Sequence, residues 1–222
     1  MCGRYSFSIP SKAKSLVNLG IPQAQLARLK PRYNITPSQQ VAAMLDDGTR
    51  HLEPLRWGLV PSWAEDEKVG HRMINARAET LTEKASFKHL LNKQRCLILA
   101  DGFYEWKGEG TGKQPYFIHL RSGDPFTFAG LWAQWSNPKG GVVRSCTIIT
   151  CQPNKLMASI HNRMPVILSG KDQEAWLDSR IVDGQAMANL LKPYPEKEME
   201  AYTVAKTVNS PANDTEDCLK PS

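Results

Sequence analysis

Short runs of apolar, β-branched and aromatic residues, separated by turns that are rich in glycine, dominate the second half of the chain. Two of these runs, residues 96–100 and 103–107, flank Asp101-Gly102, and a two-residue Asp-Gly connection is a strong signal for a β-hairpin. Three more strands are predicted at residues 116–120, 126–132 and 142–150. This half of the chain is therefore expected to form a largely antiparallel sheet.

The first half adds one more predicted hairpin, with strands at residues 41–45 and 55–59 around the turn Asp46-Asp47-Gly48. Residues 11–30 have a mostly helical pattern that a glycine and a proline interrupt. Three short helices are predicted later in the chain, at residues 154–160, 171–179 and 184–191. The helices are short enough to lie at the periphery of the sheet.

The order of these elements predicts an α+β fold with a single domain, in which a strongly bent antiparallel β-sheet or barrel-like core carries peripheral helices. The 222 residues fit one domain of ordinary size, and no internal repeat or low-complexity linker divides them. We expect the domain to span residues 1–209. Residues 210–222 are polar and contain proline, so this tail is expected to fray.

Composition narrows the class of function. Lys and Arg together number 28 against 22 Asp and Glu, and this excess suits an anionic partner without requiring one. The chain has no apolar run long enough to span a bilayer and no secretory signal, which favours a cytoplasmic location, associated with the nucleoid in a bacterium. The five cysteines include no C-x-x-C pair, so neither a structural zinc nor a disulfide framework is expected. No metal or cofactor is predicted, and a metal-free nucleophile becomes the leading chemistry.

Cys2 is the candidate nucleophile. Removal of Met1, which is usual when the second residue is small, would leave an amine and a thiol on adjacent carbons. An α-amine, with a reference pKa of about 7.7–8.0, is partly neutral at cellular pH and can form an imine with an aldehyde. The thiol can then close on the imine carbon to give a five-membered thiazolidine. Alternatively, the thiol attacks a peptide or amide carbonyl with the amine as its base, or the cysteine has no chemical role.

Three further residues have side chains suited to proton transfer or to holding a substrate. Glu105 lies among aromatic residues on a predicted strand, where burial would raise its pKa and suit it to general acid–base catalysis; an edge-strand glutamate in water is the alternative. His161 is a candidate for proton transfer near neutral pH, although lone histidines are more often structural. Asn75 and Arg77 would point to the same side of an extended segment and could bind a sugar and a phosphate, or simply pair with Glu79.

Other residues are candidates for contact with a nucleic acid. Arg4 and Arg163 offer guanidinium groups for phosphates, and Gly3 permits close approach of the backbone. Pro37 and Trp63 are apolar groups of the kind that stack on or separate bases. Ordinary packing of loops on the sheet is the alternative for both.

Seven sequence blocks, in one order and covering nearly the whole chain, resemble the SOS-response-associated peptidase (SRAP) family. They are Met-Cys-Gly-Arg at 1–4, Arg-Tyr-Asn-Ile-Thr-Pro at 32–37, Arg-Trp-Gly-Leu-Val-Pro-Ser-Trp at 56–63, Ile-Asn-Ala-Arg-Ala-Glu at 74–79, Asp-Gly-Phe-Tyr-Glu-Trp at 101–106, His-Asn-Arg-Met-Pro at 161–165 and Val-Asn-Ser-Pro at 208–211. The resemblance implies the fold of that family and a role in the repair of damaged DNA linked to the SOS response. It implies an abasic-site sensor that binds single-stranded DNA and forms a covalent crosslink through its N-terminal cysteine, with associated lyase chemistry.

The resemblance also implies a role for each candidate residue. Cys2 would supply the amine and thiol of a thiazolidine, Glu105 and His161 would move protons, and Asn75 would hold the reacting end. The remaining family positions would contact DNA: Gly3, Arg4, Pro37, Trp63, Arg77 and Arg163. The expected partners are single-stranded DNA with abasic sites and a methionine aminopeptidase for maturation, with no membrane, and the chain is expected to act as a monomer.

Two other functions stay open. The family name implies a peptidase, and an N-terminal-nucleophile cysteine peptidase would need the Cys2 thiol but no DNA. Because only Met1 precedes Cys2 here, a self-cleaving step is not needed to expose the cysteine. A non-catalytic module that binds single-stranded DNA is the other alternative. Glu65, Asp66 and Glu67 would repel DNA if they faced the site.

Overall fold

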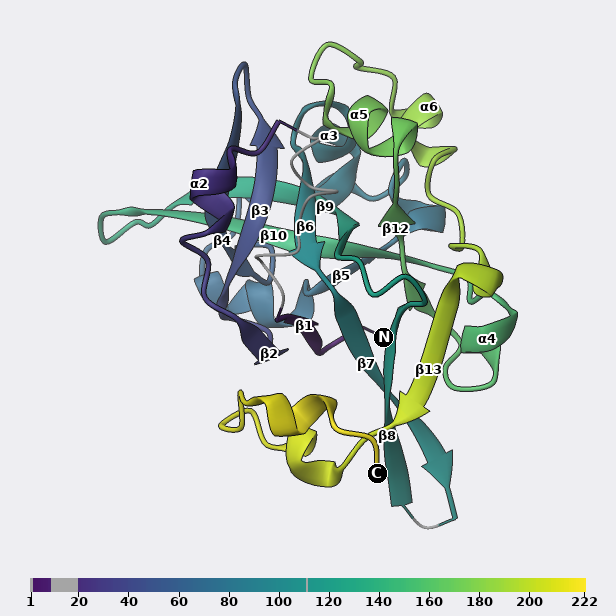
Figure 1. The fold of residues 1–222 in the computed structure, drawn as a ribbon. Coiled ribbons are helices and arrows are strands. Elements are labelled where there is room, and N and C mark those ends of the chain that lie inside the picture. Colours follow the sequence, from purple (N-terminus) through teal and green to yellow (C-terminus); the bar gives the residue numbers. More distant parts are fainter. Residues whose placement is uncertain (1, 9–19, 111) are drawn as a thin grey trace.

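A computed structural model of the chain describes residues 2–8, 20–110 and 112–222. Five strands of the larger sheet close into a barrel (Figure 1). Neighbouring strands pair antiparallel from β4 through β3, β6 and β9 to β10, and a short parallel pairing of β10 with β4 closes the ring. These strands are β3 (Gln40–Asp46), β4 (Arg50–Trp57), β6 (Arg95–Ala100), β9 (Phe126–Ser136) and β10 (Val142–Cys151). Three short strands extend the sheet at β10 and β9: β5 (Asn75–Arg77), β11 (Met164–Pro165) and β12 (Ile167–Leu168).

A second sheet lies beside the barrel, and within the described residues it has five strands in the order β13-β8-β7-β1-β2. They are β1 (Tyr5–Phe7), β2 (Arg32–Ile35), β7 (Gly102–Glu109), β8 (Gly112–Leu120) and β13 (Met199–Thr203). Figure 1 shows that β7 follows directly from β6, so one continuous segment leaves the barrel and enters the second sheet. The N-terminal end of the described chain lies against this sheet near the barrel.

The Asp101-Gly102 hairpin predicted between β6 and β7 is wrong, although both strands exist. β6 pairs with β3 and β9, and β7 pairs with β1 and β8. Asp101 instead binds the N-terminal strand, because its carboxylate accepts hydrogen bonds from the hydroxyls of Ser6 (2.5 Å) and Ser8 (2.8 Å). Gly102 is required by packing, since a Cβ there would overlap the ring of Phe117. The same two residues that signal a turn therefore mark the crossing between two sheets.

The other sequence predictions are mostly confirmed. β3 and β4 form the predicted hairpin around Asp46-Asp47-Gly48, with Gly48 at a φ of 112° that favours glycine, but β4 begins at Arg50 and ends at Trp57, earlier at both ends than the predicted strand at residues 55–59. The three later helices are present but shorter than predicted: α4 (Lys155–Ala158), α5 (Lys171–Leu177) and α6 (Gly184–Ala188). The helix α3 (Ala85–Lys93) was not predicted. Of the helical segment predicted at residues 11–30, residues 11–19 lie outside the described residues, and the remainder forms only α2 (Gln23–Leu26).

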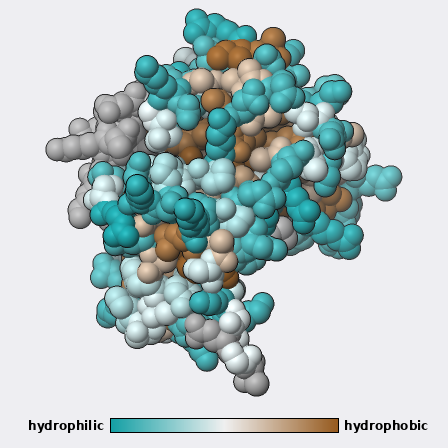
Figure 2. All heavy atoms as spheres, turned by 90° about the vertical axis from the view of Figure 1, so that its right-hand side faces the viewer, coloured by the Kyte–Doolittle hydropathy of each residue, from teal (hydrophilic) through white to brown (hydrophobic). Residues whose placement is uncertain are grey.

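The α+β fold with a barrel-like core and peripheral helices is confirmed. Hydrophilic side chains cover most of the face that carries β13 and α4, and apolar residues gather mainly in its upper half, at the level of α5 and α6 (Figure 2). Within the described part of the chain, the exposed large hydrophobic residues are Trp63, Val142 and Val182. Trp63 is the one aromatic residue of the three. None of the described helices has the length and apolar character of a membrane span.

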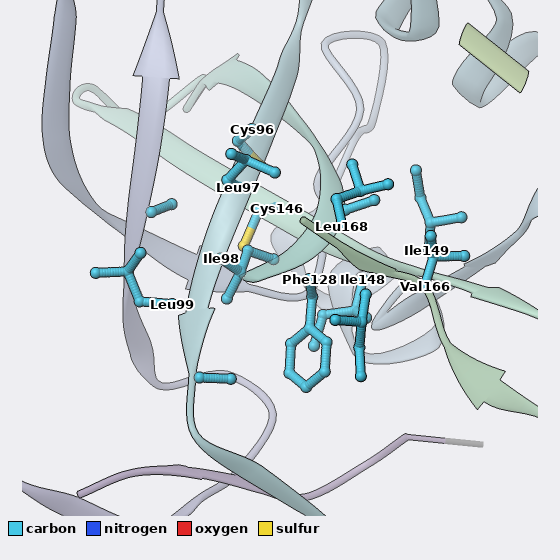
Figure 3. Close-up of a cluster of buried hydrophobic side chains, with 14 of the residues drawn as sticks. Cys96, Leu97, Ile98, Leu99, Phe128, Cys146, Ile148, Ile149, Val166 and Leu168 are labelled. Carbon is cyan, nitrogen blue, oxygen red and sulfur yellow. The ribbon is translucent and has the colours of Figure 1, made fainter. Parts of the chain in front are cut away.

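Side chains fill the barrel, so its interior is a packed core. Figure 3 shows apolar side chains from β6, β9 and β10 converging with those that follow β10. Gly130 on β9 makes room for them, since a Cβ at this position would lie 2.9 Å from both Sγ of Cys96 and Cδ1 of Ile98. A core packed at this density resists displacement of its strands, which gives the residues attached to the strand ends fixed positions.

Residues 210–222, which were expected to fray, are folded against the second sheet. The 3-10 helix η6 (Glu216–Leu219) buries Cys218, and Val204 forms a β-bridge with Pro221. The Asn34 side-chain amide donates hydrogen bonds to the carbonyl oxygens of Ser210 (3.0 Å) and Asn213. A polar sequence is compatible with order here because its partners come from other elements, among them β2, which is far away in the sequence, and β13.

Candidate active site

The N-terminal segment runs antiparallel to β7 and places Cys2 beside Glu105. Tyr5 pairs with Phe103, and the Tyr104 backbone N–H donates to the Arg4 carbonyl oxygen at 2.9 Å. Continued toward the terminus, this register sets Cys2 opposite the middle of β7. Cys2 is completely buried. Burial, and next the neighbouring Glu105 carboxylate, raise the pKa of the Cys2 thiol far above its ordinary value, so the thiol is protonated in this state.

Glu105 lies on β7 and is buried near Cys2 and His161. The predicted alternation along the strand is confirmed, because Phe103 packs in the main core whereas Tyr104 and Trp106 pack in a second cluster under the C-terminal residues. Only 3 % of Glu105 is exposed. Burial raises the pKa of its carboxyl, and the nearby His161 partly offsets this by lowering it. The carboxyl group is thereby suited to exchange protons nearer to neutral pH than an ordinary glutamate.

Asn75 reaches the N-terminal residue from the barrel side. It begins β5, which pairs in parallel with β10, so that Asn75 lies beside Ile148. Its side-chain amide donates a hydrogen bond of 2.8 Å to the Cys2 carbonyl oxygen. Its Oδ1 atom is buried and has no hydrogen-bond partner among the described residues. Asn75 therefore fixes the main chain of Cys2 and keeps an acceptor available for a bound molecule.

His161 follows α4 in a tight turn. Its backbone N–H donates to the Met157 carbonyl oxygen at 2.7 Å, and the chain then enters β11, which pairs with β10. The His161 Nε2 atom lies 3.9 Å from Oε2 of Glu105. Cys2, Asn75, Glu105 and His161 thus come from four separate segments and meet at one place. All four were predicted from the sequence as catalytic residues, and their shared location is consistent with that prediction.

The three predicted phosphate-binding arginines differ in their surroundings. Arg77 is exposed, two residues along β5 from Asn75. Arg4 is partly buried, where it donates to the Asn34 side chain (2.8 Å) and the Val208 carbonyl oxygen (2.6 Å) and lies over Trp106. Arg163 is buried, and its guanidinium binds both carboxylate oxygens of Glu79 at 2.6 and 2.9 Å. Of the three, Arg77 has the guanidinium group most available to a ligand.

Trp63 stands on a well-supported loop, residues 58–73, which we call the Trp63 loop. Trp63 is 65 % exposed. The loop is closed at its base by direct contact between the backbones of Gly58 and Gly70, where a Cβ on Gly70 would lie 2.6 Å from the Gly58 carbonyl oxygen. Trp135 supports it from the barrel by donating its indole N–H to the Ala64 carbonyl oxygen at 2.6 Å. The exposed indole is therefore carried on a fixed support.

The Trp63 loop lies next to the turn that contains Pro37 and leads directly into β5. Ser38, after Pro37, has its hydroxyl 3.3 Å from Nδ1 of His71 on this loop. Pro37 and Gly3 are each partly buried. The acidic residues of the loop are exposed, and Glu67 forms an ion pair with Arg56 at 3.2 Å, while Asp66 caps the 3-10 helix η2 (Glu67–Arg72). The ion pair with Arg56 neutralises part of the negative charge of the loop.

Sequence reasoning missed the importance of Glu79. Glu79 was considered as a partner of Asn75 or Arg77, but its carboxylate binds Arg163, 84 residues away in the sequence. Arg163 further donates to the Thr150 carbonyl oxygen at 2.6 Å. No local pattern signals this pairing, because Glu79 lies on the 3-10 helix η3 (Ala78–Thr80) after β5, Arg163 directly precedes β11, and both strands pair with β10. Among the described residues, no three His, Cys, Asp or Glu side chains are grouped to hold a metal.

Comparisons with known proteins place this geometry in context. The family model described as SOS response associated peptidase (SRAP) matches residues 1–211. The abasic site processing protein YoqW of Bacillus subtilis is 44 % identical over 225 residues, which cover 99 % of each chain. The abasic site processing protein HMCES of Gallus gallus is 36 % identical over 87 % of this chain and 67 % of its own length. A crystal structure of a Bacteroides thetaiotaomicron protein is 26 % identical, with a TM-score of 0.86 over the full length of both chains.

Proposed function

The chain belongs to the SOS response associated peptidase family, and from this premise we propose that it processes abasic sites by binding single-stranded DNA and forming a thiazolidine crosslink through Cys2. The observation that carries the proposal is the convergence of Cys2, Asn75, Glu105 and His161 from four segments. The relatives named abasic site processing proteins support the same substrate. The proposal requires that Met1 has been removed, because only then does Cys2 have a free amine.

The proposed reaction joins two functional groups of Cys2 to one carbon of the sugar. The abasic sugar opens to its aldehyde, the Cys2 amine attacks the carbonyl carbon, and loss of one water gives an imine. The Cys2 sulfur then forms a bond to the imine carbon while the imine nitrogen gains a proton. The net change is the joining of protein and DNA with loss of one water, and no oxidant, reductant or metal is needed.

The surroundings of Cys2 favour attack by the amine first. Because burial and Glu105 raise the pKa of the thiol, the thiolate is scarce, whereas an α-amine has a reference pKa of about 7.7–8.0. Once the imine has formed, the thiol must lose its proton to attack. Glu105, which neighbours Cys2 and has a raised pKa, is assigned to accepting that proton and to returning one to the imine nitrogen. His161 is assigned to opening the sugar ring.

Single-stranded DNA fits the proposed site better than an intact duplex, because the sugar must reach a buried residue. Trp63, 65 % exposed on its fixed loop, is assigned to stacking on a base and turning the strand. Pro37 lies on the adjacent turn and Gly3 permits close approach of the backbone. Arg77 is assigned to a phosphate beside the lesion. Arg4 and Arg163 are not assigned to DNA contacts, because Nη1 of Arg4 and both Nη atoms of Arg163 already bind protein atoms and the Nε atom of each is buried.

Lyase activity is a consequence of the same intermediate. An imine acidifies the hydrogens on the adjacent sugar carbon, so that β-elimination and strand cleavage compete with closure of the ring. The neighbouring thiol suppresses cleavage, because it consumes the imine. We therefore expect the protein to protect the strand, with cleavage as a minor product.

A crosslinking assay tests the proposal. Mature protein is incubated with a single-stranded oligonucleotide that carries one abasic site, and the heated sample is run on a denaturing gel. We expect a heat-stable conjugate from the wild type and none from Cys2→Ala, which keeps an α-amine and should cleave more of the strand. Cys218→Ser is the matched control, since Cys218 is also buried and a serine can keep its contact with the Asn213 carbonyl oxygen. An equally stable conjugate from Cys2→Ala would reject the crosslink.

The same samples separate the alternative functions. Turnover of a peptide without DNA, lost in Cys2→Ala, would support a cysteine peptidase. Unchanged affinity for DNA in Cys2→Ala, together with no covalent product on any oligonucleotide, would support a non-catalytic binding module.

A further inference from the structure

The Nδ1 atom of His161 has a hydrogen-bond partner that decides where its proton lies. The Arg163 backbone N–H donates to Nδ1 at 3.0 Å. A backbone N–H cannot accept a proton, so Nδ1 must be the acceptor, and the neutral imidazole carries its hydrogen on Nε2. The Arg163 carbonyl oxygen, 3.3 Å from Nδ1, is then a neighbour and not an acceptor. His161 therefore presents an N–H group, and no lone pair, toward Oε2 of Glu105.

This hydrogen bond holds only while the backbone of Arg163 keeps its place, and the Arg163 side chain secures that place. Its guanidinium binds both oxygens of Glu79 in a bidentate ion pair and donates to the Thr150 carbonyl oxygen. The next residue, Met164, pairs with Cys151 on β10. Both the side chain and the backbone at this point are thus attached to β10, a strand of the barrel.

The same contacts argue against Arg163 as a phosphate ligand. Its side chain is only 10 % exposed, and Nε, the atom without a partner among the described residues, is buried. A phosphate would have to displace Glu79 from a bidentate pair, which is the strongest arrangement available to a guanidinium and a carboxylate. Arg77 meets no such obstacle at the surface of β5.

We infer that Arg163 and Glu79 are positioning residues, which hold His161 with its proton on Nε2, directed at Glu105 and the sugar. The inference deepens the proposed function and rests on it for the chemical consequence. In this arrangement His161 donates a hydrogen bond through its Nε2–H to the opening sugar, and Glu105 accepts protons. The carboxylate of Glu79 acts through Arg163 and touches neither DNA nor the reacting atoms.

The direct test is the ¹⁵N NMR spectrum of the histidine side chains in DNA-free protein, with His161 assigned through a His161→Gln variant. In the neutral imidazole we expect a protonated Nε2 and an unprotonated Nδ1. In Glu79→Gln and in Arg163→Lys, which lose the charge or the planar fork of the pair, we expect a mixture of both tautomers. A wild-type imidazole with its proton on Nδ1, or evenly shared between the nitrogens, would overturn the inference.

The rate of crosslinking at saturating abasic DNA is the second test, because it does not depend on affinity. Both variants are expected to react more slowly, by up to about 100-fold, as misplacement of a catalytic group by an ångström can cause. Asp178→Asn is the matched control: it breaks a bidentate pair with Arg180, whose side chain is 88 % exposed and which lies in the connection between α5 and α6. It should react like the wild type.

The two roles of Arg163 predict opposite results for Glu79→Gln. If Arg163 bound phosphate, removing Glu79 would free it, and DNA binding would tighten with no loss of rate at saturation. That outcome, with an unchanged tautomer, contradicts the inference. If the wild type forms no crosslink at all, the proposed function fails, while the NMR spectra still decide whether the pair controls the tautomer. Should Arg163→Lys not fold, Glu79→Gln and the wild-type spectrum carry the test.

Discussion

Glu105 is a buried carboxyl group, and its replacement should make the protein more stable and less active. Because burial raises its pKa, the folded protein binds more protons than the unfolded chain between about pH 4.3, the ordinary glutamate value, and the raised value. Stability therefore falls as pH rises through that interval. Glu105→Gln removes this loss and should be more stable at neutral pH by about 1 kcal/mol, with crosslinking strongly reduced.

Urea unfolding of both proteins over a pH series measures this effect. The difference in stability should be small below the ordinary glutamate pKa, grow as pH rises, and then level off. If Glu105→Gln is instead less stable than the wild type, and the difference is largest at neutral pH, then neighbouring groups stabilise the ionised carboxylate by more than burial destabilises it.

Arg77 is the exposed guanidinium assigned to a phosphate, and its contribution should depend on salt. Arg77→Ala is expected to weaken binding of single-stranded DNA regardless of sequence, and to reduce the slope of log K against log salt by about 0.7, the value for one phosphate on a single strand. Arg180→Ala removes an equal charge from another exposed arginine and should leave the slope unchanged. Equal losses in the two variants would mean that only net charge matters.

At the scale of elements, the Trp63 loop depends on a contact between two backbones. In Gly70→Ala the new Cβ would overlap the Gly58 carbonyl oxygen, which belongs to the main chain and cannot turn away. We expect a loss of about 1–3 kcal/mol in unfolding free energy and weaker DNA binding as Trp63 shifts. Gly108→Ala is the control, since nothing lies within 4 Å of its Cβ position, and it should change stability by less than about 0.5 kcal/mol.

Denaturant unfolding and DNA titration of the two glycine variants check this expectation. If Gly70→Ala is as stable as Gly108→Ala, the two backbones can separate without cost, and the loop is not a fixed support for Trp63.

The C-terminal segment is attached to β2 through Asp214. Burial alone would raise the pKa of this carboxyl, but hydrogen bonds from Arg32 and from the backbone N–H groups of Tyr33 and Asn34 outweigh burial and hold it below its usual value. A depressed folded pKa contributes stability above the unfolded value of about 3.9, and that contribution is lost as pH falls. Asp214→Asn should therefore cost about 1–3 kcal/mol at neutral pH.

Thermal or denaturant unfolding of Asp214→Asn across the acid range tests the attachment. The two proteins should become equally stable once the wild-type carboxyl is protonated. A cost that persists unchanged to low pH would assign the effect to shape and not to charge.

At the scale of the whole molecule, the sequence predicts strands better than their partners. Alternation along residues 103–106 correctly places Phe103 and Glu105 on one face, because that property depends only on strand geometry. The hairpin at Asp101-Gly102 fails because β1, from the other end of the chain, takes the position beside β7. The order at residues 210–222 was missed for the same reason, since several of its partners lie on β2, far away in the sequence.

The candidate site shows the same limit. The local sequence predicts the chemistry of four individual side chains, those of Cys2, Asn75, Glu105 and His161. That they form one site was predicted only from the resemblance to a family. Burial of Cys2, the pairing of Glu79 with Arg163, and the tautomer of His161 depend on contacts between segments that the two sheets bring together. Local sequence patterns carry no information on these contacts.

The mass spectrum of the intact conjugate tests the central claim, the thiazolidine at Cys2, most directly. Mature protein is reacted with single-stranded abasic DNA and divided, and one half is treated with borohydride before measurement. We expect the mass of the chain without Met1, plus the oligonucleotide, minus one water, and no change on treatment, because a closed thiazolidine has no C=N bond to reduce. A conjugate that gains two hydrogens with borohydride is an imine, and that result would contradict a thiazolidine at Cys2.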